Sequence, residues 1–259
     1  MKIAVAGKGG TGKTFLAGSL AFLLARAGHT TLAIDADSAP NLGSFLGLSS
    51  GESETITPIS KNDELIAAKT RTGFPGVYAL NFTVDDVVRK HAVLTPSGVN
   101  LLVMGTVLSA GAGCTCPASS VVRALLRHLL VDRDEMIVLD MEAGLEHLGR
   151  GTAENVDIML VVSDANHQSL AIAGTIIRLA REAGIPRTAL VGNRIMNDAQ
   201  REAIQEFARS HDIPVFGLVP FDDAVTRAGM AGDPVSALAD SDAVHEVREI
   251  LHRIQENRE

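Results

Sequence analysis

Short apolar segments alternate with longer segments of helical periodicity along almost the whole chain. The apolar segments, rich in Val, Ile, Leu and Ala, predict strands at residues 2–6, 30–34, 99–104, 136–139, 158–162, 188–191 and 215–219. The segments with apolar residues at helical spacing predict helices at residues 13–27, 63–70, 117–130, 168–183, 198–211 and 242–255. Strands that alternate with helices are typical of an α/β fold with a doubly wound, mostly parallel sheet flanked by helices.

The alternation starts within the first residues and continues to the last helix, without an internal repeat or a low-complexity linker. We therefore expect one domain over residues 1–259. Residues 49–76 are polar and poorly periodic, which predicts a surface excursion with some helix. The last predicted helix has an apolar stripe at Val244, Val247, Leu251 and Ile254 and a polar face of mixed charge, so we expect it to pack on the sheet.

Composition and charge narrow the functional classes. Aromatic residues make up 3% of the chain and Trp is absent, so the core is built from Ala, Val, Leu and Ile, as in a sheet covered on both faces. The formal net charge of −8 disfavours nonspecific binding to nucleic acid or to an anionic membrane. The N-terminal strand leaves no room for a signal peptide, and no apolar run is long enough to span a bilayer, so we expect a cytoplasmic protein.

A phosphate-binding loop is predicted at residues 7–14, GKGGTGKT, between the first strand and the first helix. The sequence fits the pattern G-x-x-x-x-G-K-[ST] in the context that the motif requires. The glycines Gly7, Gly9, Gly10 and Gly12 let backbone N–H groups, including that of Thr11, turn toward phosphates, and the helix N-terminus adds partial positive charge. Lys13 is expected to contact the β- and γ-phosphates of ATP and to act in catalysis, and the Thr14 hydroxyl is expected to bind Mg²⁺.

Acidic residues are predicted beside the phosphates. Asp35 and Asp37 follow the second strand in LAIDADSAPNL, and Asp140 ends a strand in MIVLDMEAG. Carboxylates at the carboxyl ends of strands next to a phosphate loop can hold the waters of Mg²⁺ or orient the attacking water. They can equally cap the helices that follow, and this structural alternative is strongest for Asp35.

The chain has two cysteines, Cys114 and Cys116, in a glycine-rich segment just before the helix predicted to start at Pro117. Thiols near a helix N-terminus have a lowered pKa, which favours the thiolate form that binds metals. Two thiolates are half of a four-coordinate site, so a twofold dimer could bring four sulfur ligands together. Sulfur ligands alone do not choose between Zn²⁺, Ni²⁺ and an Fe–S cluster.

Lys8 is an additional lysine in the phosphate loop, at a position where the general motif does not specify a basic residue. GKGGTGKT resembles the deviant phosphate loop of the nitrogenase iron protein and the Min and Par ATPases, in which the early lysine reaches the partner's phosphates across a nucleotide-bound dimer. With the Cys114–Cys116 pair and the segment DMEAGLEHLGRGT at residues 140–152, nearly the whole chain is similar to the accessory ATPases that insert nickel into carbon monoxide dehydrogenase.

That resemblance implies roles for individual residues. Asp37 matches the residue that positions or activates water, Asp35 and Asp140 match outer-sphere Mg²⁺ groups, and Gly144 matches a backbone donor to the γ-phosphate. The family's base-binding positions are matched by Asn193, Pro220, Phe221 and Asp222. Phe15 matches the ATP-binding residue that follows the phosphate loop, although that residue is usually Thr.

The resemblance also implies partners: a homodimer controlled by ATP and metal, one Ni or Zn ion shared by the cysteines of both chains, and a client nickel enzyme, carbon monoxide dehydrogenase. Two alternatives stay open, a Min- or Par-type positioning or partitioning ATPase and an Fe–S reductase component like the nitrogenase iron protein. The roles of Glu142, Glu146, His147 and Arg150 also stay open.

Overall fold

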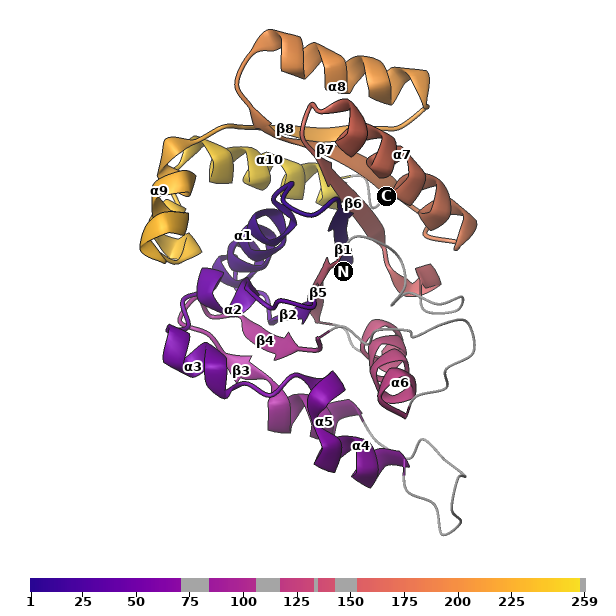
Figure 1. Ribbon diagram of the computed structural model, residues 1–259, viewed down its shortest axis with the longest axis vertical. Helices are drawn as coiled ribbons and strands as arrows, with labels where there is room; N and C mark the ends of the chain where they lie inside the picture. The colour runs from indigo at the N-terminus through magenta and orange to yellow at the C-terminus, as the bar shows by residue number, and fades with distance from the viewer. Residues whose placement is uncertain (71–83, 106–116, 133–134, 143–152, 257–259) are drawn as a thin grey trace.

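A computed structural model describes residues 1–70, 84–105, 117–132, 135–142 and 153–256. Its centre is an eight-stranded sheet with the strand order β3-β4-β2-β5-β1-β6-β7-β8 (Figure 1). The strands are β1 (Lys2–Gly7), β2 (Thr31–Ala36), β3 (Val93–Leu94), β4 (Asn100–Val103), β5 (Met136–Met141), β6 (Ile158–Ser163), β7 (Thr188–Ile195) and β8 (Val215–Pro220). Neighbouring strands pair in parallel except β3 and β4, which are antiparallel. The predicted mostly parallel α/β sheet is confirmed.

Helices lie on both faces of this sheet, with α1, α2 and α10 on one side and α6 and α7 on the other (Figure 1). The α-helices are α1 (Lys13–Arg26), α2 (Leu42–Phe45), α3 (Ser50–Thr55), α4 (Asp63–Thr70), α5 (Val84–His91), α6 (Pro117–Asp132), α7 (His167–Glu182), α8 (Asp198–Ser210), α9 (Asp223–Ala231) and α10 (Asp242–Glu256). Three short 3₁₀ helices are η1 (Ile59–Lys61), η2 (Ala153–Asn155) and η3 (Val235–Leu238). Among the described helices, none combines the length and apolarity that crossing a bilayer requires.

Two apolar cores fill the space between the sheet and its helices. Successive side chains of a strand point to opposite faces, so in β1 Ala4 and Ala6 join one core while Ile3 and Val5 join the other. Both faces are covered, and this explains why the strands are apolar throughout rather than alternating with polar residues. The apolar stripe of α10 lies in the second core, as the sequence predicted.

Several strands extend beyond their predicted ends, and in β2 and β7 this changes the place of two site residues. β2 continues to Ala36 because it remains paired with its neighbours, Asp35 with Val103 and with Asp140. β7 continues to Ile195 through an irregularity in its pairing with β8. The expectation that Asp35 follows its strand was wrong, because it lies inside β2. Asn193, beyond the predicted strand end at residue 191, lies inside β7, and Asp140 precedes the last residue of β5.

The sequence reading also missed α5, α9 and the short strand β3. The polar stretch at residues 49–76 contains α3 and η1 as well as the predicted α4. A signal for α3 was available, since Ser49 and Glu52 form a capping box in which each side chain accepts from the other's backbone N–H.

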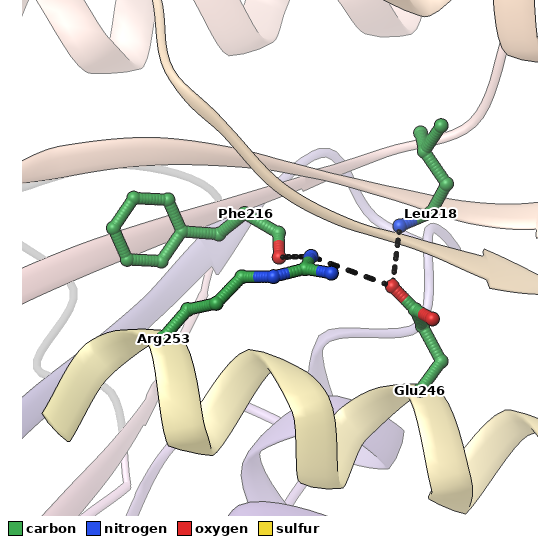
Figure 2. A network of polar contacts seen from close by, with 4 residues as sticks. All are labelled: Phe216, Leu218, Glu246 and Arg253. Carbon is green, nitrogen blue, oxygen red and sulfur yellow. Dashed lines mark hydrogen bonds and ion pairs between the residues drawn. The ribbon is translucent and has the colours of Figure 1, made fainter. Parts of the chain in front are cut away.

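The outer strand β8 pairs with β7 on one side, and α10 side chains cover backbone groups on its other side (Figure 2). Glu246 accepts the N–H of Leu218 at 3.2 Å, and Arg253 donates to the carbonyl of Phe216. The two side chains also form an ion pair of 3.8 Å. Exposed strand edges tend to pair with other chains, so this arrangement protects the edge.

Candidate nucleotide-binding site

The predicted phosphate loop lies where the strand order reverses. From β1 the chain crosses through α1 to β2, on one side of β1, whereas β6 pairs with β1 on its other side. In open α/β sheets, ligands bind at such a reversal, in the crevice outside the carboxyl ends of the strands. The predicted site residues of β1, β2, β5, β7 and β8 all lie at or next to those ends.

The phosphate loop is held by its own hydrogen bonds. The carbonyl of Lys8 accepts from the backbone N–H of Thr11 at 3.3 Å and from the Thr11 hydroxyl at 2.8 Å. Gly12, with φ of 99°, is the N-cap of α1, and the first turn of the helix follows directly. The first N–H groups of a helix have no acceptor inside the helix, so they are available to an anion such as phosphate.

Two glycines of the loop are required by close contacts. A Cβ on Gly7 would lie 2.4 Å from the carbonyl oxygen of Val162 on β6, and a Cβ on Gly12 would lie 2.1 Å from the side-chain nitrogen of Asn193. Both positions also have positive φ values, 145° and 99°, which L side chains rarely adopt. The loop can therefore take this shape only with glycine at these positions.

The two lysines of the loop differ in exposure. Lys13 is 7% exposed, and its ammonium group lies 3.5 Å from the carbonyl of Lys8, to which it donates. Lys8 is half-buried. The ammonium group of Lys13, which the motif assigns to the phosphates, thus lies against the backbone of the phosphate loop.

Asp140 is the most unusual carboxylate of the site. It is 1% exposed, and neither oxygen accepts a hydrogen bond of normal geometry from the described residues. Burial raises the pKa of Asp140 to about 7; Thr14 and the charge of Lys13 act in the opposite direction. A buried acceptor without a donor is costly, so this side chain fits a position beside a cation or its waters. Thr14 and Asp140 would hold Mg²⁺, which would offset phosphate charge.

Asp35 lies opposite Asp140 on the neighbouring strand but is satisfied by the protein. Its two oxygens accept the backbone N–H groups of Asp37 at 3.1 Å and of Leu42, the first residue of α2, at 3.0 Å. Burial raises the pKa of Asp35, and these backbone bonds lower it in part. The contacts correspond to the structural alternative, in which Asp35 fixes the chain between β2 and α2.

Asp37 comes directly after β2 and is half-buried. One of its oxygens accepts the N–H of Ala39 at 3.0 Å and lies 3.3 Å from the hydroxyl of Ser38. The Ser38 hydroxyl also donates to Glu142 at 3.0 Å. The Ser38–Glu142 contact was not anticipated, because the two residues are 104 positions apart and the sequence assigned no role to either.

Asn193 connects the β7 end of the site to the phosphate loop. Its side-chain nitrogen donates to the carbonyl of Thr11 at 2.7 Å, and its side-chain oxygen accepts the N–H of Arg194 at 2.9 Å. Arg194 has a φ of 58°, so the chain turns sharply here, and the pairing of β7 with β8 is irregular between Gly192 and Ile195. Asn193 therefore supports the loop directly, and contact with the base stays a prediction.

The second predicted base loop follows β8. The N–H of Phe221 donates to the carbonyl of Ile195, which joins this loop to the end of β7, and the ring of Phe221 is 43% exposed. Asp222 accepts the N–H of Ala224 at 2.8 Å and of Ala243 at 3.4 Å, so its carboxylate caps both α9 and α10. Pro220 ends β8. Phe221 is thus the side chain of this loop that is open to a base.

Of the remaining predicted site residues, Phe15 lies within the described part of the chain and the others do not. The ring of Phe15 packs edge-on against Phe45 of α2, with 5.9 Å between centroids, so of its groups the backbone N–H is left to face a phosphate. Cys114, Cys116 and Gly144, like Glu146, His147 and Arg150, lie outside the described residues. Within the described ranges, no group of three or more His, Cys, Asp or Glu could hold a metal ion.

Comparisons with known proteins agree with this geometry. Residues 2–235 match the model of the family described as "CobQ/CobB/MinD/ParA nucleotide binding domain". The chain belongs to this family and is a P-loop ATPase.

Relatives with similar sequences narrow the family. The chain is 42% identical to the carbon monoxide dehydrogenase accessory protein CooC of Rhodospirillum rubrum over 236 residues, 90% of this chain and 88% of the relative. It is 38% identical to an uncharacterised ATP-binding protein of Methanocaldococcus jannaschii over 259 residues, 98% and 97% of the two chains. The predicted resemblance to the accessory ATPases is therefore confirmed at the level of sequence.

Solved structures confirm the fold. The MinD cell division protein of Aquifex aeolicus superimposes with a TM-score of 0.70 at 20% identity, covering 99% of this chain and 97% of that one. The septum site-determining protein MinD of Pyrococcus horikoshii, solved as a complex with Mg-ADP, gives a TM-score of 0.68 at 17% identity, covering 98% and 96%.

Proposed function

We propose that this protein is a cytoplasmic ATPase that inserts nickel into carbon monoxide dehydrogenase, with a homodimer as its active form. The observation that carries the proposal is the 42% identity, over 90% of this chain, to a carbon monoxide dehydrogenase accessory protein. Nickel is the cargo in this proposal, and ATP binding and hydrolysis control its capture and release.

The described site supports the ATP half of the cycle. The phosphate loop, Lys13 and the first turn of α1 bind the phosphates, and Thr14 and Asp140 hold Mg²⁺. Asp37, directly after β2, orients the attacking water. Asn193 and Phe221 form the base end of the site, one through its amide and the other through its exposed ring.

The cargo half depends on Cys114 and Cys116, which precede α6. α6 starts at Pro117 and leads into β5, the strand that carries Asp140. The cysteine pair and a carboxylate of the ATP site are thus separated by one helix and part of one strand. A dimer that brings two pairs together supplies four thiolates for one nickel ion, and Lys8 of each chain contacts the phosphates bound by the other.

A Min-type positioning function has less support. Such a function needs an apolar helix face that can enter a bilayer. In α10 the apolar residues Val244, Val247 and Ile254 are fully buried in the core, so this helix cannot supply that face while the fold is intact. The similarity to MinD structures concerns the fold.

Activation of nickel-free carbon monoxide dehydrogenase tests the proposal. The purified client would be incubated with limiting Ni²⁺, Mg²⁺·ATP and this protein, and nickel incorporation would be measured by elemental analysis together with activity. Wild type should raise incorporation, and Asp37→Asn and the Cys114→Ser/Cys116→Ser variant should not. Equal incorporation with and without the protein at limiting nickel would refute the proposal.

A further inference from the structure

We propose that Glu142 is a positioning residue for ATP hydrolysis: through the hydroxyl of Ser38 it orients the carboxylate of Asp37. The inference rests on the proposed role of Asp37 in orienting water. It gives a function to two residues that the phosphate-loop motif does not include.

The sheet register brings the three side chains together. β2 and β5 are parallel neighbours in which Asp35 lies opposite Asp140 and Ala36 opposite Met141. The residues that follow these pairs, Asp37 and Glu142, therefore leave the sheet side by side at its carboxyl edge. Ser38 lies between them, with its hydroxyl 3.0 Å from Glu142 and 3.3 Å from Asp37.

The Ser38 hydroxyl group does not serve the two carboxylates equally. Ser38 has one hydroxyl proton, so it can give a full hydrogen bond to only one of the two carboxylates at a time. The shorter distance belongs to Glu142. The Ser38 hydroxyl proton, held mainly by Glu142, is shared with the Asp37 oxygen that lies 3.3 Å away and also accepts the N–H of Ala39 at 3.0 Å. The other Asp37 oxygen accepts no hydrogen bond from the described residues. That oxygen is free to accept a proton from water.

Charge gives the contact a second effect. The charge of Asp37 raises the pKa of both Asp35 and Asp140, so its carboxylate lies within electrostatic range of the two buried aspartates. Glu142 adds a further negative group on the same edge. The Ser38 hydroxyl proton, shared by Glu142 and Asp37, reduces their repulsion and limits the directions in which the Asp37 carboxylate can point.

Without Ser38 or Glu142, the carboxylate of Asp37 is still present but is no longer held in one orientation. The expected defect therefore lies in the chemical step rather than in nucleotide binding, because neither side chain belongs to the phosphate loop or the base loops. A hydrogen bond of this kind corresponds to roughly a 3- to 10-fold change in rate.

Steady-state ATPase kinetics of matched variants test the inference. Ser38→Ala and Glu142→Ala should each lower kcat about 3- to 10-fold with KM for Mg²⁺·ATP within about twofold of wild type. The double variant should be no slower than either single variant, since both remove the same contact. Ser38→Thr and Glu142→Gln should recover most of the rate because they keep a hydroxyl and an acceptor oxygen. Glu206→Ala, an exposed carboxylate on α8, serves as the control.

Further measurements distinguish the positioning role of Glu142 from the proposed role of Asp37 in orienting water. Melting temperatures and binding of a fluorescent ATP analogue show whether each variant is folded and occupied. If Asp37→Asn loses turnover while Ser38→Ala and Glu142→Ala retain wild-type kcat, or if their defects simply multiply in the double variant, the positioning role is refuted and Asp37 is not. If Asp37→Asn itself retains turnover, the proposed role of Asp37 fails and the inference fails with it.

Discussion

The side-chain nitrogen of Asn193 donates a 2.7 Å hydrogen bond to the carbonyl of Thr11, which lies 182 residues earlier in the chain. This bond joins the irregular end of β7 to the phosphate loop, and Gly12 is the residue that leaves room for it. Asn193, which the family resemblance assigns to the nucleotide base, therefore also helps to set the shape of the phosphate loop. The interaction leads to the first prediction.

Gly12→Ala should abolish ATP binding because its Cβ would lie 2.1 Å from the Asn193 side-chain nitrogen at a φ of 99°. Asn193→Ala should weaken binding about 10-fold, through loss of one buried hydrogen bond to the loop. Calorimetric titration with Mg²⁺·ATP measures both. Gly229→Ala on α9, where the added methyl meets nothing within 4 Å, is the control. Wild-type affinity in Gly12→Ala would show that the loop has another shape.

Asp140→Asn should stabilise the nucleotide-free protein at high pH. Because burial raises the pKa of Asp140 from 3.8 to about 7, the folded protein keeps this proton where the unfolded chain releases it. Its contribution to stability therefore falls as pH rises from about 4 to about 7. The variant should gain roughly 2–4 kcal/mol over wild type at pH 8 and little near pH 4.

Thermal melting across that pH range, without Mg²⁺ or nucleotide, measures the difference for Asp140→Asn. Addition of Mg²⁺·ATP should then stabilise wild type more than the variant, because the variant lacks the carboxylate proposed to hold Mg²⁺. A pH-independent difference between the two proteins would mean that the carboxylate is not protonated in this range.

Lys8→Ala should bind ATP and fail to dimerise with it. Lys8 is half-buried in the loop, and its proposed partner is the phosphate chain bound by the second subunit. Light scattering during size exclusion, with a non-hydrolysable ATP analogue and Mg²⁺, should give a dimer for wild type and a monomer for the variant. Lys61→Ala removes an exposed charge far from the loop in sequence and should behave as wild type. A Lys8→Ala dimer of normal affinity would reduce Lys8 to a surface charge.

Glu246→Ala should make the protein less stable and more prone to associate. The change removes the acceptor for the Leu218 N–H on the outer strand β8 and the ion pair with Arg253 (Figure 2). The expected cost is about 1–2 kcal/mol, with concentration-dependent association through the uncovered edge. Denaturant melts and analytical ultracentrifugation check both effects. Glu249→Ala on the exposed side of α10 should change neither.

Much of the architecture could be predicted because the signals were local. The phosphate-loop pattern and the apolar strands each depend on residues close together in the sequence, and the structure agrees with them. Asp140 lies near Thr14 and Lys13 because the carboxyl ends of parallel strands meet at one edge, and its role toward Mg²⁺ stays a prediction. The overall sheet followed from the same regular alternation.

The remaining features depend on contacts that sequence spacing does not encode. Asp35 accepts two backbone N–H groups that spacing does not reveal, and its role as an outer-sphere Mg²⁺ group stays a prediction. The Asp222 carboxylate accepts N–H groups at the starts of two helices, and contact of its loop with the base stays a prediction. The Ser38–Glu142 and Asn193–Thr11 hydrogen bonds join residues more than a hundred positions apart, so they appear only when the sheet register is known.

The number of nickel ions bound per chain, with and without ATP, tests the central claim most directly. The measurement is an anaerobic Ni²⁺ titration under reducing conditions, combined with native mass spectrometry to count chains and metals. The proposal predicts one nickel for every two chains through Cys114 and Cys116, an affinity that ATP changes about 5- to 150-fold, and loss of this site in the Cys114→Ser/Cys116→Ser variant. One metal on every single chain, unchanged in that variant and indifferent to ATP, would contradict both the shared site and the nickel-insertion function.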